Sequence, residues 1–227
     1  MTVRRPVPAP DFVGYPEVRR SIRALLDGRP GTHDLPVPAC PEWTVTALLG
    51  HLVEIAGRVL ARHGRTPPPA PAPDVPGLLD RWDDLGAELD PLLAAAGGRS
   101  GEIMVMDAYT HELDLRAALG VPPPAEHVAW APSFEVLVRG FAGSVTGRGL
   151  PALRLRTTGG SEWTAGDGRP AASVTAPPHD LYHALAGRRS LAELVELDWT
   201  AAPDPWLPAF SWGPFTPPPA RVSRRAG

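Results

Sequence analysis

Cysteine is almost absent from the chain: of 227 residues only Cys40 carries a thiol, so no disulfide can form within it. This excludes a small secreted domain that is held together by disulfides. No apolar run approaches the ~20 residues that a membrane-spanning helix needs. Arg4 and Arg5 precede no apolar segment, so the start of the chain lacks the pattern of a signal peptide. We therefore expect a soluble, cytoplasmic protein.

An excess of charge of either sign is also absent. The formal net charge is −3 and the sequence pI about 6.2, so electrostatics favour neither a nucleic-acid partner nor an anionic membrane. The basic residues are all arginine, and 30 prolines and 23 glycines accompany them, which indicates a GC-rich coding sequence of a high-GC bacterium. Hydrophobic residues make up 43% of the chain, enough at this length to bury a core.

Several motifs of common enzyme classes are missing. No Gly-x-Gly-x-x-Gly follows a predicted strand and no P-loop is present, so we exclude the usual nucleotide-binding sites. No Gly-x-Ser-x-Gly elbow supports Ser-His-Asp catalysis. Cys40 precedes a proline and has no basic neighbour in the sequence that would stabilise a thiolate. A packing or incidental cysteine is therefore the favoured interpretation.

The first half of the chain has helical periodicity. Apolar residues recur every three or four positions in four segments, residues 11–26, 45–63, 78–96 and 103–119. Thr44 is expected to cap the second segment by accepting a backbone N–H, with Trp43 packing back onto Leu48. Residues 29–42 and 66–76 are expected to be loops. This pattern predicts a four-helix bundle.

The second half of the chain has a different pattern. Its expected elements are a helix at 132–146, strands at 153–157, 162–165 and 172–176, and a helix at 179–186. The tail from Trp206 to Gly227 receives no assignment. We therefore expect an α+β protein with two domains, a helical one at residues 1–125 and a smaller α+β one at residues 126–227.

Two pairs of residues have the spacing of metal ligands. Asp107 and His111 lie four residues apart in the fourth predicted helix, so both side chains share one face and can bind one divalent metal. His179 and His183 have the same spacing in the last predicted helix. The alternatives are a solvated polar face around His111, and a histidine at position 179 that only covers the first helical turn.

A third residue, His51, favours the first pair. It lies in the middle of the second predicted helix, beside the apolar face, where an imidazole needs a hydrogen-bond partner or a metal. If the second and fourth helices are neighbours, His51, Asp107 and His111 converge and leave a coordination position open, as in catalytic zinc sites. A core histidine satisfied by a carbonyl or by Tyr109 is the alternative.

Two segments carry a family resemblance. The first is Cys40-Pro41-Glu42-Trp43-Thr44-Val45, followed by Leu48 to His51, and the second runs from Thr110 to Gly120. Both resemble motifs of the mycothiol-dependent maleylpyruvate isomerase family, within the wider DinB-like superfamily. The second half of the chain resembles the smaller C-terminal domain of that family more loosely.

The resemblance implies both a fold and a cofactor. It implies a DinB-like four-helix bundle that holds a divalent metal, usually zinc, through His51, Asp107 and His111. It also implies that this metal activates the thiolate of mycothiol, an actinobacterial cofactor, toward a small electrophilic substrate. The isomerase that names the family has a glutamate where this chain has Asp107, which is one methylene shorter. The substrate does not transfer with the resemblance.

Two functions are compatible with these residues. The first is a metal-dependent transferase or isomerase that uses a thiol, in which Glu112 or Asp114 orients a ligand histidine. Arg188 would meet a carboxylate of the cofactor, although a surface arginine is the alternative, and no catalytic residue is assigned. The second function is a non-catalytic metal- or small-molecule-binding or regulatory protein on the same scaffold.

Overall fold

The computed structural model describes residues 14–66, 74–96 and 99–221. The chain divides into two compact units, of which the first ends at Ser133 and the second begins at Phe134. Helices and small sheets occur together, so the predicted α+β class is confirmed. Among the described residues, no helix is both long enough and apolar enough to cross a bilayer.

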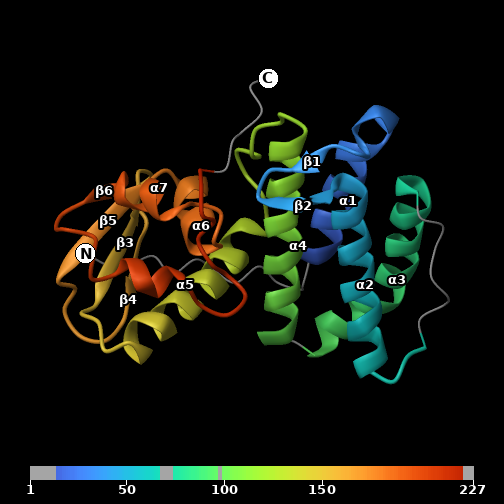
Figure 1. Cartoon of the computed structure of the whole chain (residues 1–227). Coiled ribbons are helices and arrows are strands. Elements are labelled where there is room, and N and C mark those ends of the chain that lie inside the picture. The colour runs from blue at the N-terminus through green and yellow to red at the C-terminus, as the bar shows by residue number, and fades with distance from the viewer. Residues whose placement is uncertain (1–13, 67–73, 97–98, 222–227) are drawn as a thin grey trace. The chain divides into compact units, whose positions relative to one another are not determined.

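Four helices dominate the first unit (Figure 1). They are α1 (Gly14–Leu26), α2 (Val45–Arg62), α3 (Val75–Ala96) and α4 (Arg99–Ala118). Helix α2 packs on α3, α1 packs on α4, and α4 also contacts α2 and α3. All four form where the apolar periodicity predicted helices, although α3 begins at Val75, inside the predicted loop, and α4 begins at Arg99, four residues earlier than predicted. The part of the first prediction at residues 11–13 lies outside the described residues.

The N-cap fixes where α2 begins, and the apolar face fixes how the helix is rotated about its own axis. The side chain of Thr44 accepts the N–H of Ala47 at 3.2 Å, which confirms the predicted N-cap. Leu48 and Leu52 are at most 1% exposed, and burying each leucine side chain contributes about 1.5–3 kcal/mol. Because these leucines face the core, the rotation of the helix is set, and with it the direction of the neighbouring His51.

Helix α4 is buried on nearly all sides at its centre. Every residue from Ala108 to Leu115 is buried, including Glu112 at 0% and Asp114 at 2% exposure. The alternative of a solvated polar face around His111 is therefore wrong. Buried carboxylates need hydrogen-bond or ionic partners, and these partners define the two faces of α4 described below.

A short hairpin corrects the prediction that residues 29–42 form a loop. This stretch contains a 3-10 turn, η1 (Pro30–Thr32), and strand β1 (Pro36–Val37). Strand β2 (Cys40–Thr44) begins in it and pairs antiparallel with β1. Strand β1 has two residues, too few to show an alternating pattern, and proline usually argues against a strand. In the folded unit β1 contacts α4 and β2 contacts α2.

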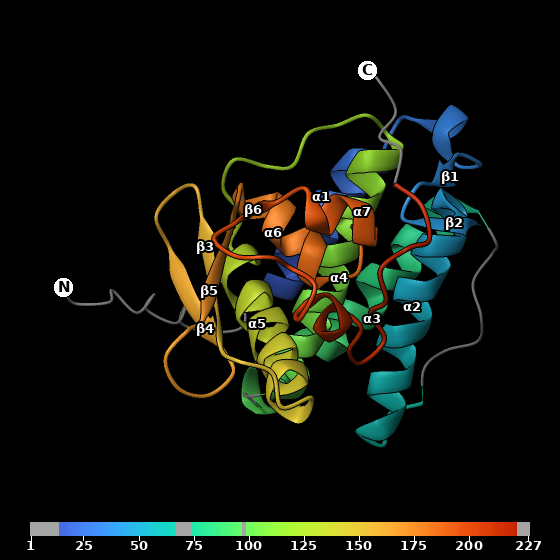
Figure 2. The same cartoon turned by 60° about the vertical axis from the view of Figure 1, so that its left-hand side comes forward.

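The second unit is a mixed sheet with helices on one face (Figure 2). Its strands are β3 (Leu153–Thr157), β4 (Glu162–Ala165), β5 (Ala172–Ala176) and β6 (Asp198–Trp199), in the order β4-β3-β5-β6. Its helices are α5 (Trp130–Gly147), which begins four residues before the unit boundary, α6 (Pro178–Leu185), α7 (Leu191–Val195) and the 3-10 turn η2 (Leu207–Phe210). Strand β3 pairs antiparallel with β4 and parallel with β5. The elements β6, α7 and η2 were not predicted.

Candidate functional site

Three predicted ligand residues come together in the first unit. His51 from α2 and Asp107 and His111 from α4 have ligand atoms that all lie within 4.8 Å of one another. Asp107 Oδ2 lies 3.9 Å from His51 Nε2, and Asp107 Oδ1 lies 3.8 Å from His111 Nε2. The carboxylate therefore lies between two imidazoles, and each imidazole faces it with Nε2.

The donor set fits a divalent cation of the zinc type. Two ligands at about 2.0–2.1 Å from a tetrahedral zinc ion lie about 3.3–3.4 Å apart. The observed 3.9 and 3.8 Å, which run to the two different oxygens of Asp107, exceed this by about half an ångström. The third pair of ligand atoms lies within 4.8 Å, so a bound ion would draw the three side chains closer together. The side chains of His51 and Asp107 are 23% and 32% exposed, so the cluster is reached by solvent on one side. The cluster therefore offers three donor atoms to a cation and leaves one direction open for a further ligand.

The protonation of His51 suits a metal ligand. Burial lowers the pKa of His51, the neighbouring His111 lowers it further, and Asp107 acts in the opposite direction. A histidine with a lowered pKa is neutral near pH 7 and keeps a lone pair on the nitrogen that is not protonated. His51 can therefore offer that lone pair to a cation without first losing a proton.

The second nitrogen of His111 has its own partner. His111 Nδ1 lies 3.0 Å from Asp114 Oδ2, and Asp114 is 2% exposed. A carboxylate in this position accepts the Nδ1–H bond and leaves the lone pair on Nε2, the atom that faces Asp107. Of the two acidic residues expected to orient a ligand histidine, Asp114 makes this contact.

Glu112 faces a different set of partners. Its Oε1 accepts hydrogen bonds from Ser21 Oγ at 2.7 Å and from Arg116 Nε at 2.8 Å. Its Oε2 lies 3.4 Å from His127 Nε2, and burial lowers the pKa of His127 although Glu112 opposes that shift. Because Ser21 belongs to α1, this buried cluster attaches α4 to α1 and has a structural role.

Trp43 of β2 forms an aromatic cover over both histidines. The centroid of its ring lies 4.9 Å from that of His51 and 5.7 Å from that of His111. The two imidazoles lie edge to face, with centroids 5.1 Å apart. The hairpin thus supplies a side chain that restricts the rotation of both imidazoles. The predicted packing of Trp43 onto Leu48 stays a prediction.

The other predicted site residues lie in the second unit. His183 of α6 is 8% exposed, with its ring edge-on to Tyr182, and Arg188 donates to the carbonyl of Ala186 at 2.9 Å. In the part of the chain that the structure describes, neither His179 nor His183 belongs to a group of three or more ligand-type side chains. The second histidine pair therefore lacks the third donor that His51 supplies to the first.

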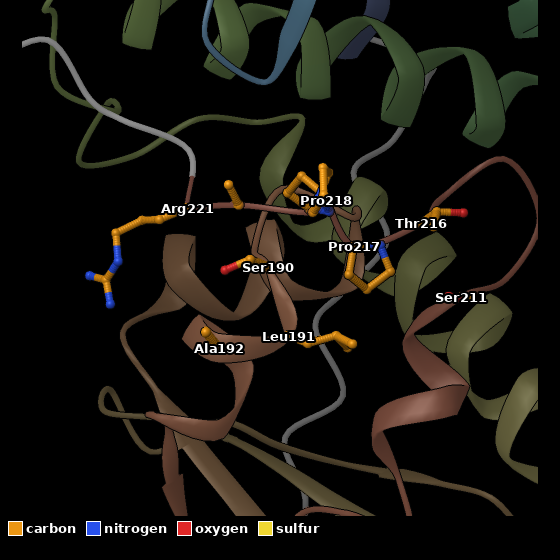
Figure 3. A pocket seen from close by; sticks show the side chains of 10 residues that line it. Ser190, Leu191, Ala192, Ser211, Thr216, Pro217, Pro218 and Arg221 are labelled. Atoms are coloured by element: carbon orange, nitrogen blue, oxygen red, sulfur yellow. The ribbon is translucent and has the colours of Figure 1, made fainter.

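A pocket in the second unit offers no comparable donors (Figure 3). Its volume is about 270 Å³, and its walls come from the start of α7 and the proline-rich segment that follows Phe215. The lining residues are Ser190, Leu191, Ala192, Ser211, Thr216, Pro217, Pro218, Pro219, Ala220 and Arg221. Since no histidine, cysteine or carboxylate lines it, we assign no chemistry to this pocket.

Cys40, which was not predicted to take part in the site, lies beside this cluster. In the structure Cys40, His111 and Asp114 form another group whose ligand atoms lie within 4.8 Å of one another. The contact depends on the hairpin, which the sequence pattern does not reveal. The only signal was the position of Cys40 three residues before Trp43, in the first of the two family-like segments.

Comparison with known proteins supports the fold. No protein-family model matches the sequence, and no curated protein is significantly similar to it. Among solved structures, a mycothiol-dependent maleylpyruvate isomerase is similar, with a TM-score of 0.50 and 16% identity over 84% of this chain and 90% of that chain. A histidine-to-alanine mutant of a mycothiol-dependent maleylpyruvate isomerase gives a TM-score of 0.53 and 14% identity with the same coverage. At this identity the similarity shows the fold, and it agrees with the predicted α+β architecture.

Proposed function

We propose that the chain is a metal-dependent transferase or isomerase that uses a thiol cofactor, with His51, Asp107 and His111 as the metal ligands. The observation that supports this function is the convergence of three ligand atoms within 4.8 Å. It occurs in a chain whose fold is similar to that of a mycothiol-dependent maleylpyruvate isomerase. We propose mycothiol as the thiol and a small electrophile as the substrate.

Each residue of the cluster has a separate task. Asp107 supplies the one negative charge, and His51 and His111 supply neutral nitrogen donors. A divalent cation in this set keeps a net positive charge, and as a Lewis acid it would favour the thiolate form of a cofactor thiol. Asp114 holds the proton on His111 Nδ1 and so keeps Nε2 available.

Trp43 shapes the environment of the cluster. Its half-buried indole lies over both imidazoles and excludes water from one side of them. Fewer water dipoles near the site strengthen the attraction between a positive centre and a thiolate. The partly exposed side chains of His51 and Asp107 leave another side open for a cofactor and a substrate.

Elemental analysis of untagged protein tests this proposal. We expect about one divalent cation per chain in the wild type and a loss of at least about tenfold in metal affinity for His51→Ala, since one of three ligands is removed. His63→Ala is the matched control, because His63 is an exposed histidine at the end of the same helix. Metal-free wild-type protein, together with unchanged metal uptake in His51→Ala, would contradict the proposal.

A non-catalytic binding or regulatory protein is the second candidate. The aspartate at position 107, where the family's named isomerase has a glutamate, favours it, and we assign no general base among the described residues of the cluster. Assays with mycothiol and a maleyl-type electrophile separate the two functions. Turnover that depends on both thiol and metal supports the enzyme, whereas metal binding without turnover supports the second candidate.

A further inference from the structure

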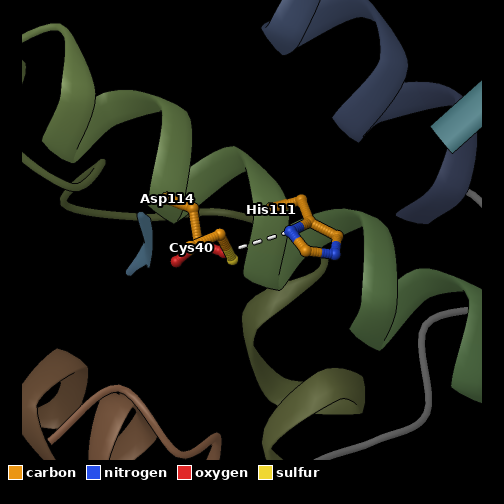
Figure 4. A group of neighbouring side chains, drawn as sticks. All are labelled: Cys40, His111 and Asp114. Carbon is orange, nitrogen blue, oxygen red and sulfur yellow. Dashed lines mark hydrogen bonds and ion pairs between the residues drawn. The ribbon is translucent and has the colours of Figure 1, made fainter. Parts of the chain in front are cut away.

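Cys40 lies against the side of His111 that the first ligand set does not use. Strand β2 carries Cys40, and α4 carries His111 and Asp114 (Figure 4). Their ligand atoms lie within 4.8 Å of one another. The chain has no second cysteine, so this thiol cannot form an internal disulfide.

The two nitrogens of His111 face two different groups. Nδ1 lies 3.0 Å from Asp114 Oδ2, whereas Nε2 lies 3.8 Å from Asp107 Oδ1. Nδ1 and Nε2 flank the same ring carbon, but their lone pairs point in different directions in the ring plane, so ligands gathered around one nitrogen are separate from those around the other. Cys40 and Asp114 form a group with His111 that does not include His51 or Asp107.

The chemistry of this second group differs from that of the first. A thiolate, an imidazole and a carboxylate together favour softer, thiophilic cations, because sulfur is the softest ligand that proteins supply. Asp114 is 2% and His111 6% exposed, so both are shielded from water, whereas Cys40 is half-buried. The thiolate and the carboxylate carry two negative charges, which a divalent cation neutralises, and neutrality lowers the free energy of burying the complex.

The spacing requires only a small adjustment. Ligands of a tetrahedral zinc-type ion lie about 3.3–3.6 Å apart, depending on whether sulfur is one of them. The 3.0 Å contact between His111 and Asp114 must widen by a few tenths of an ångström. The thiol must close in from at most 4.8 Å, which rotation of the Cys40 side chain can accomplish.

We propose that Cys40, His111 and Asp114 form a second cation site, selective for thiophilic divalent ions, that competes with the His51 site for His111. On binding, the S–H bond of Cys40 breaks, its proton goes to solvent, and the sulfur electron pair bonds to the cation. The Nδ1 proton of His111 moves to Nε2 through solvent, and Nδ1 donates its lone pair. Net release is about one proton per cation. With Nε2 protonated, His111 can no longer serve as a ligand of the first site.

The competition has a functional consequence that rests on the proposed function. A thiophilic ion at the second site removes one of three ligands from the first, so it would inhibit a metal-dependent activity without occupying the first site. The second site itself needs neither His51 nor Asp107. The two ideas can therefore fail separately.

Titration with Cd²⁺ tests the second site. We expect a sulfur-to-cadmium charge-transfer band in the ultraviolet, with release of about one proton per ion measured in buffers of different ionisation enthalpy. The band must come from Cys40, because it is the only cysteine. Cys40→Ser is expected to abolish the band and to weaken Cd²⁺ binding by about tenfold or more, as expected for loss of one ligand of three.

Three further variants complete the experiment, with circular dichroism and thermal melting to verify folding. His51→Ala is expected to keep the band, because it removes a ligand of the first site only. Asp114→Asn and His111→Gln are expected to weaken Cd²⁺ binding by about tenfold or more and to reduce the band at limiting Cd²⁺. Absence of the band in the wild type overturns the proposal. The proposal is also overturned if Asp114→Asn and His111→Gln both fold and both bind Cd²⁺ with unchanged affinity and an unchanged band, since Cys40 would then bind the ion alone.

Discussion

The indole ring of Trp43 lies against the imidazole of His51, with ring centroids 4.9 Å apart and ring planes tilted by 41°. Trp43 is the fourth residue of β2, so the contact joins a short hairpin to the middle of α2. A second contact joins the same indole to His111 of α4. The hairpin therefore connects both helices that carry the proposed ligands, and an event at the ligands should be visible at the indole.

Trp43 should report cation binding by its fluorescence. A paramagnetic ion such as Co²⁺ at the cluster is only a few ångströms from this indole, so we expect it to quench Trp43 emission. The chain has seven tryptophans, so the measurement is a difference between variants. Trp43→Phe should lose most of the Co²⁺-dependent decrease, whereas the control Trp199→Phe in the second unit should retain it. An equal decrease in Trp43→Phe would show that the ion binds elsewhere.

Asp114→Asn should weaken metal binding without removing a ligand of the first site. The substitution replaces the carboxylate that lies 3.0 Å from His111 Nδ1 with an amide of the same size. Loss of such an orienting partner typically lowers metal affinity by about 10–100-fold. Competition with a chelator measures this change. Asp84→Asn on α3, an exposed residue, is the control and should leave the affinity unchanged.

Acidification should destabilise the metal-free protein through His127. Burial lowers the pKa of His127 in the folded chain, although Glu112 and Glu17 oppose the shift. An unfolded histidine titrates near pH 6.5, so below about pH 6.5 the unfolded chain binds protons first. Stability is then full above this pH and falls as the pH drops toward the lower pKa of the folded state.

Urea unfolding between pH 5 and pH 8 in the presence of a chelator measures the effect of His127. The variant His127→Gln should show a smaller loss of stability on acidification than the wild type. The exposed His63→Gln serves as control and should follow the wild type. An identical pH dependence in His127→Gln would assign the loss to other groups, of which His51 is the first to consider.

Tyr15→Phe should destabilise the helical unit. The Trp82 indole N–H donates to the Tyr15 hydroxyl at 2.8 Å, and both side chains are at most 2% exposed. Removing the hydroxyl leaves a buried donor unsatisfied, at a cost of about 1–3 kcal/mol. The expected decrease in Tm is roughly 2–4 °C for each kcal/mol. The double variant Tyr15→Phe with Trp82→Phe measures the coupling, and additive effects would contradict the role of this bond.

The helices were predictable because each long element carries its own signals. Apolar spacing places α2, and Thr44 marks its start with a side chain that accepts the Ala47 N–H. Strands β3 and β4 were predicted with their observed bounds, since alternation in Leu153–Thr157 puts arginines on the exposed face. Strands β1 and β6 have two residues each, too few to show a periodicity of their own. Helix α7 has five residues, and its local signal is the capping box of Ser190 and Glu193 and not an apolar periodicity.

The candidate site was predictable to the extent that its residues share a helix. Asp107 and His111 lie four positions apart, and Asp114 follows His111 by three, so helical geometry alone groups them. His51 required the further assumption that two helices are neighbours. The approach of Cys40 could not be predicted, because it depends on a hairpin about 70 residues away in the sequence whose pairing has no local signature.

Helix α4 has polar partners on two faces, and adjacent residues on a helix point about 100° apart. On one face Asp107 lies near His51 of α2 and His111 near Trp43 of β2, while on the other face Glu112 contacts Ser21 of α1. Turning the helix by the step of one residue would separate both sets of partners at once. The rotational register of α4 is thus determined twice, and a descendant that lost the metal ligands would still have to keep the helix at the same angle.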